Sequence, residues 1–458
     1  MLQALINVFK IAELRNKILF TIGMLAVYRL GHWIPLPGVN QEQLADTYNR
    51  MQEDSSAAAS AVAVISMLSG GAFGHSTIFG LGVAPYISAS IIFQLLMTVW
   101  PALKKLQEEG PTGRQKIMEW TRYATIALAI VQAVSWLKVS ASQNLIYSQW
   151  VDSPAWWIMA VTALTASTVF LMWLGEQIDK HGIGNGISML IMAGILAAMP
   201  GAIKELSGAY STGGITLFAI FMLVGLFVLV VGSSVLLTVA QRRIAVQQAK
   251  HTRGRKVYGG QRSYLPLRIN HSGVMPVIFA SSLMIFPSMI LNAMASGASP
   301  ETFMGQTVGW LNDQLTYGHF IYIVGEVILI YFFSYFWITV QFNPEDMAKQ
   351  LREHGSFIPG LRPGPRTAEY LESVMERITF VGAAFLSVIA VLPMVVAQAF
   401  NISPGVAQFL GGTGLLIVVS VVLDFMQRVE ANLLMRNYAG FLSGADGKGS
   451  RIPGPRAA

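Results

Sequence analysis

Long apolar runs, each about the length that crosses a lipid bilayer, constrain this chain more than any other feature. A spanning helix needs about 20 mainly apolar residues, because the hydrocarbon core of a bilayer is about 30 Å thick. Only 12% of the 458 residues are charged, whereas soluble domains average about 25%. The sequence therefore predicts an all-α polytopic membrane protein with ten transmembrane helices. The predicted spans are residues 15–36, 76–99, 118–138, 155–178, 186–206, 215–240, 273–295, 318–341, 375–398 and 405–430.

Two of the predicted spans begin with the same pattern, GVxPxIxAS. Residues 82–90 and 273–281 agree at six positions in one register, so chance agreement in a sequence rich in Ala, Ser and Gly is the weaker explanation. Glycine and proline loosen a helix, and interrupted spans at corresponding places in two halves point to the working site of a transport protein. We therefore expect two inverted five-helix halves whose second helices face a shared pathway.

A short apolar patch precedes the first of these two helices. It is too short and too rich in small residues to span, so residues 57–75 are expected to form a re-entrant segment. The start of the chain has apolar residues at helical spacing and is expected to lie at the membrane interface. The predicted organisation is an amphipathic segment (1–14), an N-terminal half (15–206), a C-terminal half (207–436) and a flexible tail (437–458).

Basic residues gather after the even-numbered spans and around both termini. Positive charge near span ends marks the cytoplasmic side, so both termini are expected there. Two large loops, 241–270 and 341–377, lie on that side, and the first holds eight basic residues and no acidic one. Orientation alone could explain this loop. Eight basic residues also suit a polyanionic partner, which could be RNA, anionic lipid or an acidic protein surface.

Motifs for catalysis and cofactor binding are missing from the sequence. There is no HExxH, no nucleotide-binding lysine loop and no cysteine, so we expect no enzyme activity, no metal site and no cofactor. Ionisable residues inside spans are functional candidates by default, and the chain has few: Glu176, Glu326 and Asp424. Glu326, in the eighth span, has no explanation from the sequence. A secondary transporter remains the main alternative, but it would need a convergent polar site at mid-membrane.

Branched aliphatic residues recur at helical spacing in the repeated helices. Val83, Ile87 and Ile91 share one helix face, Ile187 and Ile191 repeat the spacing, and Ile278 occupies the position equivalent to Ile87. Such periodicity is ordinary in a membrane span. If these side chains converge, however, their ring could seal a pore against ions by excluding water.

Small polar residues in the same spans are a second lead. Ser88, Gln132 and Asn270 each resemble residues that hydrogen-bond between helices. Together they could line one seam.

Several motifs, spread over nearly the whole chain, give it a resemblance to the SecY family of protein-conducting channels. They are Pro35-Leu36-Pro37-Gly38, Leu171-Met172-Trp173-Leu174-Gly175-Glu176-Gln177-Ile178, Gly182-Ile183-Gly184-Asn185-Gly186-Ile187-Ser188, Gln241-Arg242-Arg243-Ile244, Phe342-Asn343-Pro344 and Gly360-Leu361-Arg362-Pro363-Gly364. The resemblance implies a channel in the bacterial cytoplasmic membrane that translocates unfolded secretory polypeptides and releases hydrophobic segments sideways into lipid. It also implies the partners SecE, SecG, the motor ATPase SecA, the ribosome, signal peptides, nascent chains and membrane lipids.

The resemblance further implies a role for particular residues. The implied pore constriction is Val83, Ile87, Ile91, Ile187, Ile191, Ile278 and Ile417, where Val83 replaces the commoner isoleucine. The implied plug includes Ile65, Met67, Leu68, Ser69, Gly70 and Gly71. The implied lateral gate has Ser88, Gln132, Asn270 and Phe286, and the implied docking site for ribosome or motor has Arg243, Arg255, Lys256 and Arg362.

Overall fold

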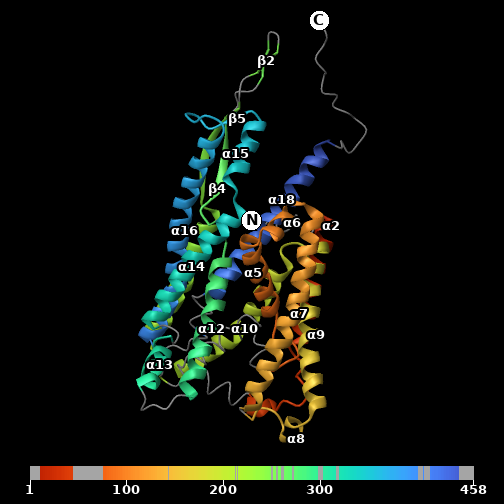
Figure 1. Ribbon diagram of the computed structural model, residues 1–458, viewed down its shortest axis with the longest axis vertical. Helices are drawn as coiled ribbons and strands as arrows, with labels where there is room; N and C mark the ends of the chain where they lie inside the picture. Colours follow the sequence, from red (N-terminus) through yellow and green to blue (C-terminus); the bar gives the residue numbers. More distant parts are fainter. Residues whose placement is uncertain are drawn as a thin grey trace.

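Ten long helices dominate the computed structural model (Figure 1). It describes residues 11–44, 76–142, 144–211, 213, 215–248, 251–253, 256–258, 262–270, 273–297, 303–315, 319–400, 406 and 413–442. Within these residues each predicted span overlaps a helix. The helices are α2 (Ala12–Gly31), α5 (Ala84–Val99), α7 (Pro111–Ser142), α9 (Pro154–His181), α10 (Gly186–Ser211), α11 (Leu217–Val239), α12 (Met275–Gly297), α14 (Phe320–Gln341), α16 (Pro365–Phe400) and α18 (Thr413–Leu442). Six are long and apolar enough by themselves to cross a membrane.

Shorter helices join the long ones. They are α6 (Pro101–Glu108), α8 (Ser148–Val151), α13 (Phe303–Gln314) and α15 (Pro344–Glu353). The axis turns by 98° between α5 and α6, and together this pair would make a seventh apolar span. The last helix, α18, continues past the predicted end of its span at residue 430.

The repeated sequence pattern is also a repeated backbone shape. Gly82 and Gly273 both adopt a left-handed conformation, with φ of 56° and 63°. Glycine favours this conformation because it has no Cβ. In both copies a proline follows within the first turn of the helix, where its missing N–H leaves no helical hydrogen bond unmade. The two GVxP stretches therefore start α5 and α12 in the same way.

Helix contacts repeat as well. Within the first five spans α5 packs on α7, α7 on α9, α2 on α9, and α2 on α10. The equivalent pairs in the second five spans are α12 with α14, α14 with α16, α11 with α16, and α11 with α18, and all four are in contact. The chain thus folds into two five-helix groups whose internal packing matches in these four pairs, as the inverted repeat predicted, whereas the contact of α9 with α10 has no comparably extensive counterpart between the described parts of α16 and α18.

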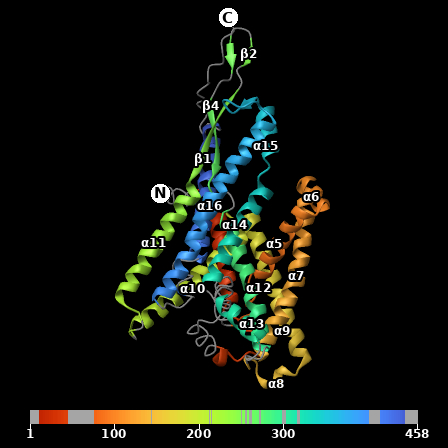
Figure 2. The same ribbon diagram turned by 60° about the vertical axis from the view of Figure 1, so that its left-hand side comes forward.

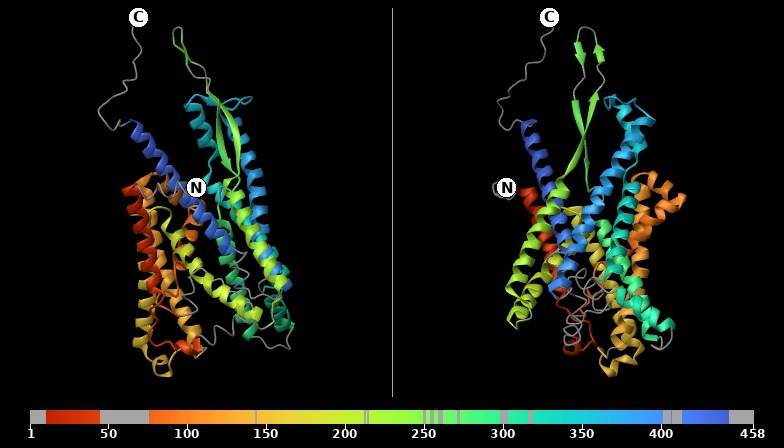
Figure 3. Two further views of the ribbon diagram at one scale, coloured as in Figure 1. Left: turned by 180° about the vertical axis from the view of Figure 1, so that it is seen from behind. Right: turned by 90° about the vertical axis from the view of Figure 1, so that its left-hand side faces the viewer.

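The two groups meet mainly along one line. Among the described residues, the substantial helix contact between the groups is between α10 and α18, which cross between them (Figure 3). The substantial contacts of α5 and α7 with neighbouring helices lie within the first group, and those of α12 and α14 lie within the second. A seam therefore runs between these two helix pairs.

A β-hairpin projects beyond one end of the helices (Figure 2), where no strand was expected from the sequence. β1 (Gln241–Gln248) pairs antiparallel with β4 (Arg262–Arg268), while β2 (His251–Arg253) pairs with β3 (Lys256–Tyr258). β5 (Ser356–Phe357), from the next loop, adds to β1. Ile244 and Val246 face inward and pack with α14 and α16. Ile244 and Val246 alternate with polar or exposed residues at a period of two, which is the sequence signal of a strand. The many charged residues around them obscured that signal. We call this end of the molecule the hairpin end.

Candidate pore and lateral gate

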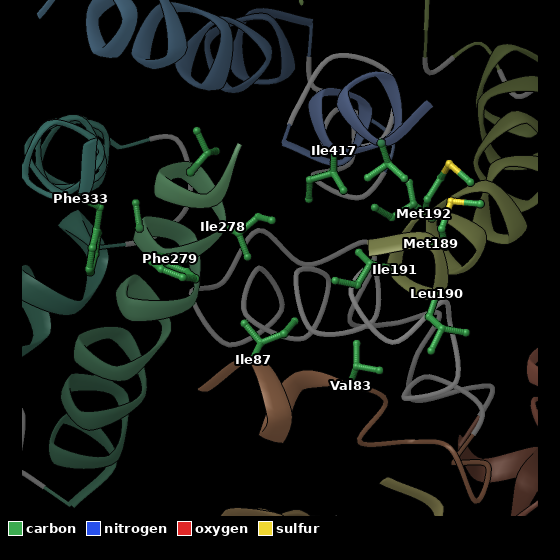
Figure 4. Close-up of a cluster of buried hydrophobic side chains, with 14 of the residues drawn as sticks. Val83, Ile87, Met189, Leu190, Ile191, Met192, Ile278, Phe279, Phe333 and Ile417 are labelled. Atoms are coloured by element: carbon green, nitrogen blue, oxygen red, sulfur yellow. The ribbon is translucent and has the colours of Figure 1, made fainter. Parts of the chain in front are cut away.

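Aliphatic side chains from both helix groups meet in one buried cluster (Figure 4). Val83 and Ile87 come from the start of α5, Ile191 from α10, Ile278 from α12 and Ile417 from α18. All five are buried, with exposed fractions of 2–7%. The half-buried residues Ile91 and Ile187 pack against them. We call these seven residues the collar.

The geometry of the two repeated helices explains how the collar forms. Ile87 and Ile278 each follow the left-handed glycine by five positions, so they point inward at equivalent places. The next residue, Phe279, turns away from the collar and packs on α14. Its ring lies 5.6 Å from that of Phe333 and 5.7 Å from that of Trp337, edge to face in both pairs. These aromatic contacts fix the rotation of α12 and keep Ile278 in the collar.

Three further residues of α10 belong to the same cluster and were missed by the sequence analysis. Met189, Leu190 and Met192 flank Ile191, and all are buried (Figure 4). Methionine adapts its shape easily because it is unbranched. Their position beside Ile191 was the only sequence feature that pointed to this cluster. It did not stand out because apolar residues are abundant in every span.

The collar offers no fixed chemistry to a passing molecule. Its side chains are hydrocarbon only, and within the part of the chain that the structure describes there is no cluster of His, Asp and Glu able to hold a metal ion. A narrow hydrocarbon ring excludes water and ions but does not bind a particular solute. A small-solute transporter needs a convergent polar site at this place. These helices bring aliphatic side chains together there instead.

The predicted gate residues lie on both sides of the seam. Ser88 directly follows Ile87 on α5, Gln132 lies on α7, and Asn270 lies five residues before the start of α12; each is half-buried. Phe286 lies on α12, but its side chain is outside the described residues. Their assignment to a lateral gate stays a prediction.

An ion pair joins two helices of the first group. Arg122 of α7 holds Glu176 of α9 in a fork, with Nε 2.7 Å from Oε1 and Nη2 2.8 Å from Oε2. Such paired bonds are strong and directional. Glu176 was singled out from the sequence, but its partner was missed because the two residues are 54 positions apart.

The loop between α9 and α10 is held just as closely. Asp179 Oδ1 accepts a hydrogen bond of 2.7 Å from the backbone N–H of Gly186. A Cβ on Gly186 would lie 2.0 Å from the carbonyl oxygen of Gly175. Only glycine fits there, so the glycine-rich motif serves close packing.

The two large loops form one structure at the hairpin end. Gln247 pairs with Phe357 and Gln248 with Ser356, so β5 brings the second loop onto the hairpin. Of the predicted docking residues, Arg243 is exposed on β1 and Arg362 is exposed shortly after β5. Lys256 lies in β3, and Arg255 is outside the described residues.

The predicted plug is also outside the described residues. This concerns Ile65, Met67, Leu68, Ser69, Gly70 and Gly71. The described chain resumes at Ser76, whose carbonyl accepts a hydrogen bond of 2.9 Å from Leu36 N–H, and it reaches the collar at Val83.

Comparison with known proteins gives a consistent result. The SecY family model matches residues 77–426. The chain is 39% identical to the protein translocase subunit SecY of Thermotoga maritima, over 98% of this chain and all of that one. It is 40% identical to the same subunit of Pseudomonas aeruginosa, over 96% and 95% of the two chains.

Solved structures share the fold at low sequence identity. A protein-conducting channel superposes with a TM-score of 0.59 at 17% identity, over 95% of both chains. A SecY protein studied for its plug domain gives a TM-score of 0.61 at 19% identity, over 95% of both chains. Since the family model covers most of the sequence and the curated relatives match it nearly end to end, this chain belongs to the SecY family.

Proposed function

We propose that this chain is the channel subunit of a bacterial protein translocase. It moves unfolded secretory polypeptides across the cytoplasmic membrane, releases hydrophobic segments sideways into lipid, and catalyses no reaction itself. The observation that carries this proposal is the collar, in which helices of both groups bring seven aliphatic side chains together within one larger apolar cluster. An unfolded chain of any sequence needs such a passage, because polar binding groups would retain some segments.

The collar supplies the barrier and the narrow passage. At rest, buried branched side chains leave no continuous path for water or ions. During transport the same side chains close around an extended polypeptide and limit leakage. Methionines behind Ile191 let the ring adjust to side chains of different sizes. The predicted plug, residues 57–75, closes the outer side of the collar at rest.

The seam supplies the lateral exit. Contacts of α5 and α7 with α12 and α14 are sparse, whereas α10 and α18 hold the two groups together elsewhere. A hydrophobic signal segment entering the seam gains about 0.8 kcal/mol for each methylene it buries. This gain favours parting of the seam, and sufficiently apolar segments then pass into the bilayer.

The hairpin end supplies the docking surface. Arg242, Arg243 and Arg262 are exposed on the strands, and Arg362 is exposed in the loop that β5 joins to them. We assign this end to the cytoplasm, together with both termini, because basic loops stay on that side. The expected partners are SecA, the ribosome and the small subunits SecE and SecG. One structural neighbour is Sec61 in a canine ribosome–channel complex, which superposes with a TM-score of 0.55 at 16% identity.

A crosslinking experiment across the seam tests this function. The chain has no native cysteine, so Ser88→Cys and Phe286→Cys can be joined by a bifunctional thiol reagent in membrane vesicles. Joining α5 to α12 should stop import of a secretory protein, and cleaving the reagent should restore it. The control pair Ile92→Cys and Tyr123→Cys joins α5 to α7 within one group and should leave import unchanged. Full import through the seam-linked channel would refute the proposal.

A further inference from the structure

Among the described residues, Glu326 is the one carboxyl group that is fully buried in the middle of a span, and the channel function does not use it. It lies on α14 and is 1% exposed. Neither carboxyl oxygen has a hydrogen-bond partner among the described residues. A carboxylate taken out of water without a partner is strongly unfavourable. Because the chain itself covers the group, lipid and partner subunits cannot reach it in this conformation.

The side chain of Glu326 lies where α14 packs against α12 and α16. Tyr322, Glu326 and Ile330 are spaced by four residues and share the buried face of α14. Tyr322 packs with Met284 of α12 and Met394 of α16 in one apolar cluster. Ile330 belongs to the central cluster that contains the collar. Glu326 therefore lies in the core of the second helix group, beside the helix that carries Ile278.

No cation on the neighbouring helices can neutralise the carboxyl group. α12 has no ionisable residue along its whole length, and α16 has none from residue 378 to its end. On α14 the titratable side chains are Tyr322, Tyr331 and Tyr335, with His319 exposed at the helix start. α13 contributes Asp313, which is exposed and is not a cation. Within the described residues, the favourable form of Glu326 is the neutral acid.

Both helices that pack around Glu326, α12 and α16, can bend close to it. α12 has Pro287 in its interior and α16 has Pro393. Each interior proline removes a helical hydrogen bond and loosens the helix locally. The two methionines that pack with Tyr322 lie within three residues of these prolines. A movement of α12 would therefore change the surroundings of the carboxyl group.

We propose that Glu326 is a proton-binding site coupled to the movement of α12. It holds a proton while α12, α14 and α16 are packed together. When α12 moves away from α14 at the seam, water reaches the carboxyl group, which releases its proton to the solvent and remains as a carboxylate. Proton binding thus stabilises the closed channel. This inference rests on the proposed function, because it takes α12 as a moving gate helix.

Infrared spectroscopy tests the protonation directly and does not depend on any gate. The full-length channel in lipid is compared with its Glu326→Gln variant at neutral pH. The difference spectrum should contain the carbonyl band of a protonated carboxyl group and no carboxylate band. A carboxylate band in place of the acid band would overturn the proposal.

A distance measurement tests the coupling. Spin labels at Ile92→Cys on α5 and Leu283→Cys on α12 use positions that are 43% and 42% exposed. The distance across the seam is measured from about pH 6 to about pH 9, because fully buried carboxyls can hold a proton well above their solution range. The ratio of open to closed channels should rise with pH by at most about tenfold per unit, the limit for one proton. Glu326→Gln should remove this dependence and favour the closed form, whereas Asp313→Asn should retain it.

The outcomes separate this inference from the proposed function. A seam that opens with a secretory polypeptide but not with rising pH overturns the proton-binding proposal and leaves the channel function intact. The same holds if Glu326→Gln responds to pH as the native chain does. A seam distance unchanged by an engaged polypeptide contradicts the channel function. The labelled chain that keeps Glu326 decides the first and last cases, so a Glu326→Gln variant that failed to fold would not obscure the result.

Discussion

At the scale of single residues, the collar depends on side chains that are apolar and branched. Replacing Ile87, Ile187 and Ile278 together with asparagine would let water wet the ring, since polar groups remove the cost of hydrating a narrow pore. We expect ion conductance of the resting channel in planar bilayers to rise at least several-fold. The matched variant with leucine at the same three positions keeps the hydrocarbon surface and should stay tight. Unchanged conductance in the asparagine variant would contradict the collar.

Close helix packing at one glycine gives a second residue-scale prediction. Gly186→Ala places a Cβ 2.0 Å from the backbone oxygen of Gly175, which cannot move aside as a side chain could. Overpacking of this kind costs about 1–3 kcal/mol, so the thermal midpoint in detergent should fall. Gly201→Ala is the control: no atom lies within 4 Å of its added Cβ, and an alanine in a helix should stabilise by about 0.5–1 kcal/mol. Equal midpoints for both variants would show that α9 and α10 do not pack this closely.

At the scale of helices, the fork between Arg122 and Glu176 makes α7 and α9 move together. The two side chains are 37% and 21% exposed, and water therefore weakens their attraction. We expect a coupling free energy of about 0.5–1 kcal/mol between them. A double-mutant cycle with Arg122→Ala and Glu176→Ala, followed by unfolding in detergent, should measure that coupling. The exposed pair Arg428 and Asp424 within α18 should couple less strongly. A coupling of zero for Arg122 and Glu176 would show that packing alone holds α7 to α9.

The helices also show how far the sequence could lead. Apolar runs located the ten long helices, because the bilayer fixes the length of a span, and the repeat around Pro85 and Pro276 identified two of the four helices that contribute to the collar. Arg122 could not be predicted as the partner of Glu176, because pairing across 54 residues depends on how the two helices are rotated against each other. The hairpin was missed because charges hid the alternation of Ile244 and Val246. The buried position of Glu326 could be suspected from its span, but not the lack of a partner.

At the scale of the whole molecule, charge is concentrated at the hairpin end. Reversing Arg255 and Lys256 to glutamate should weaken binding of the ribosome or motor at least several-fold, more so at low salt, since exposed charges are screened by ions. Co-sedimentation of the full channel in vesicles measures this. Lys204→Glu is the control, because it reverses one exposed positive charge outside the hairpin. If the hairpin variant binds as tightly as the native chain, the loop only orients the protein.

The two helix groups, joined at α10 and α18, bring aliphatic side chains together at the collar, which we propose as the passage for the polypeptide. The most direct test arrests a secretory polypeptide during import and asks which residues of the channel it touches. A photoreactive probe on the arrested polypeptide should react with a cysteine at Ile278→Cys. It should not react at Val224→Cys, on the outer face of α11, where the side chain is 56% exposed. Reaction at Val224 but not at Ile278 would contradict passage through the collar.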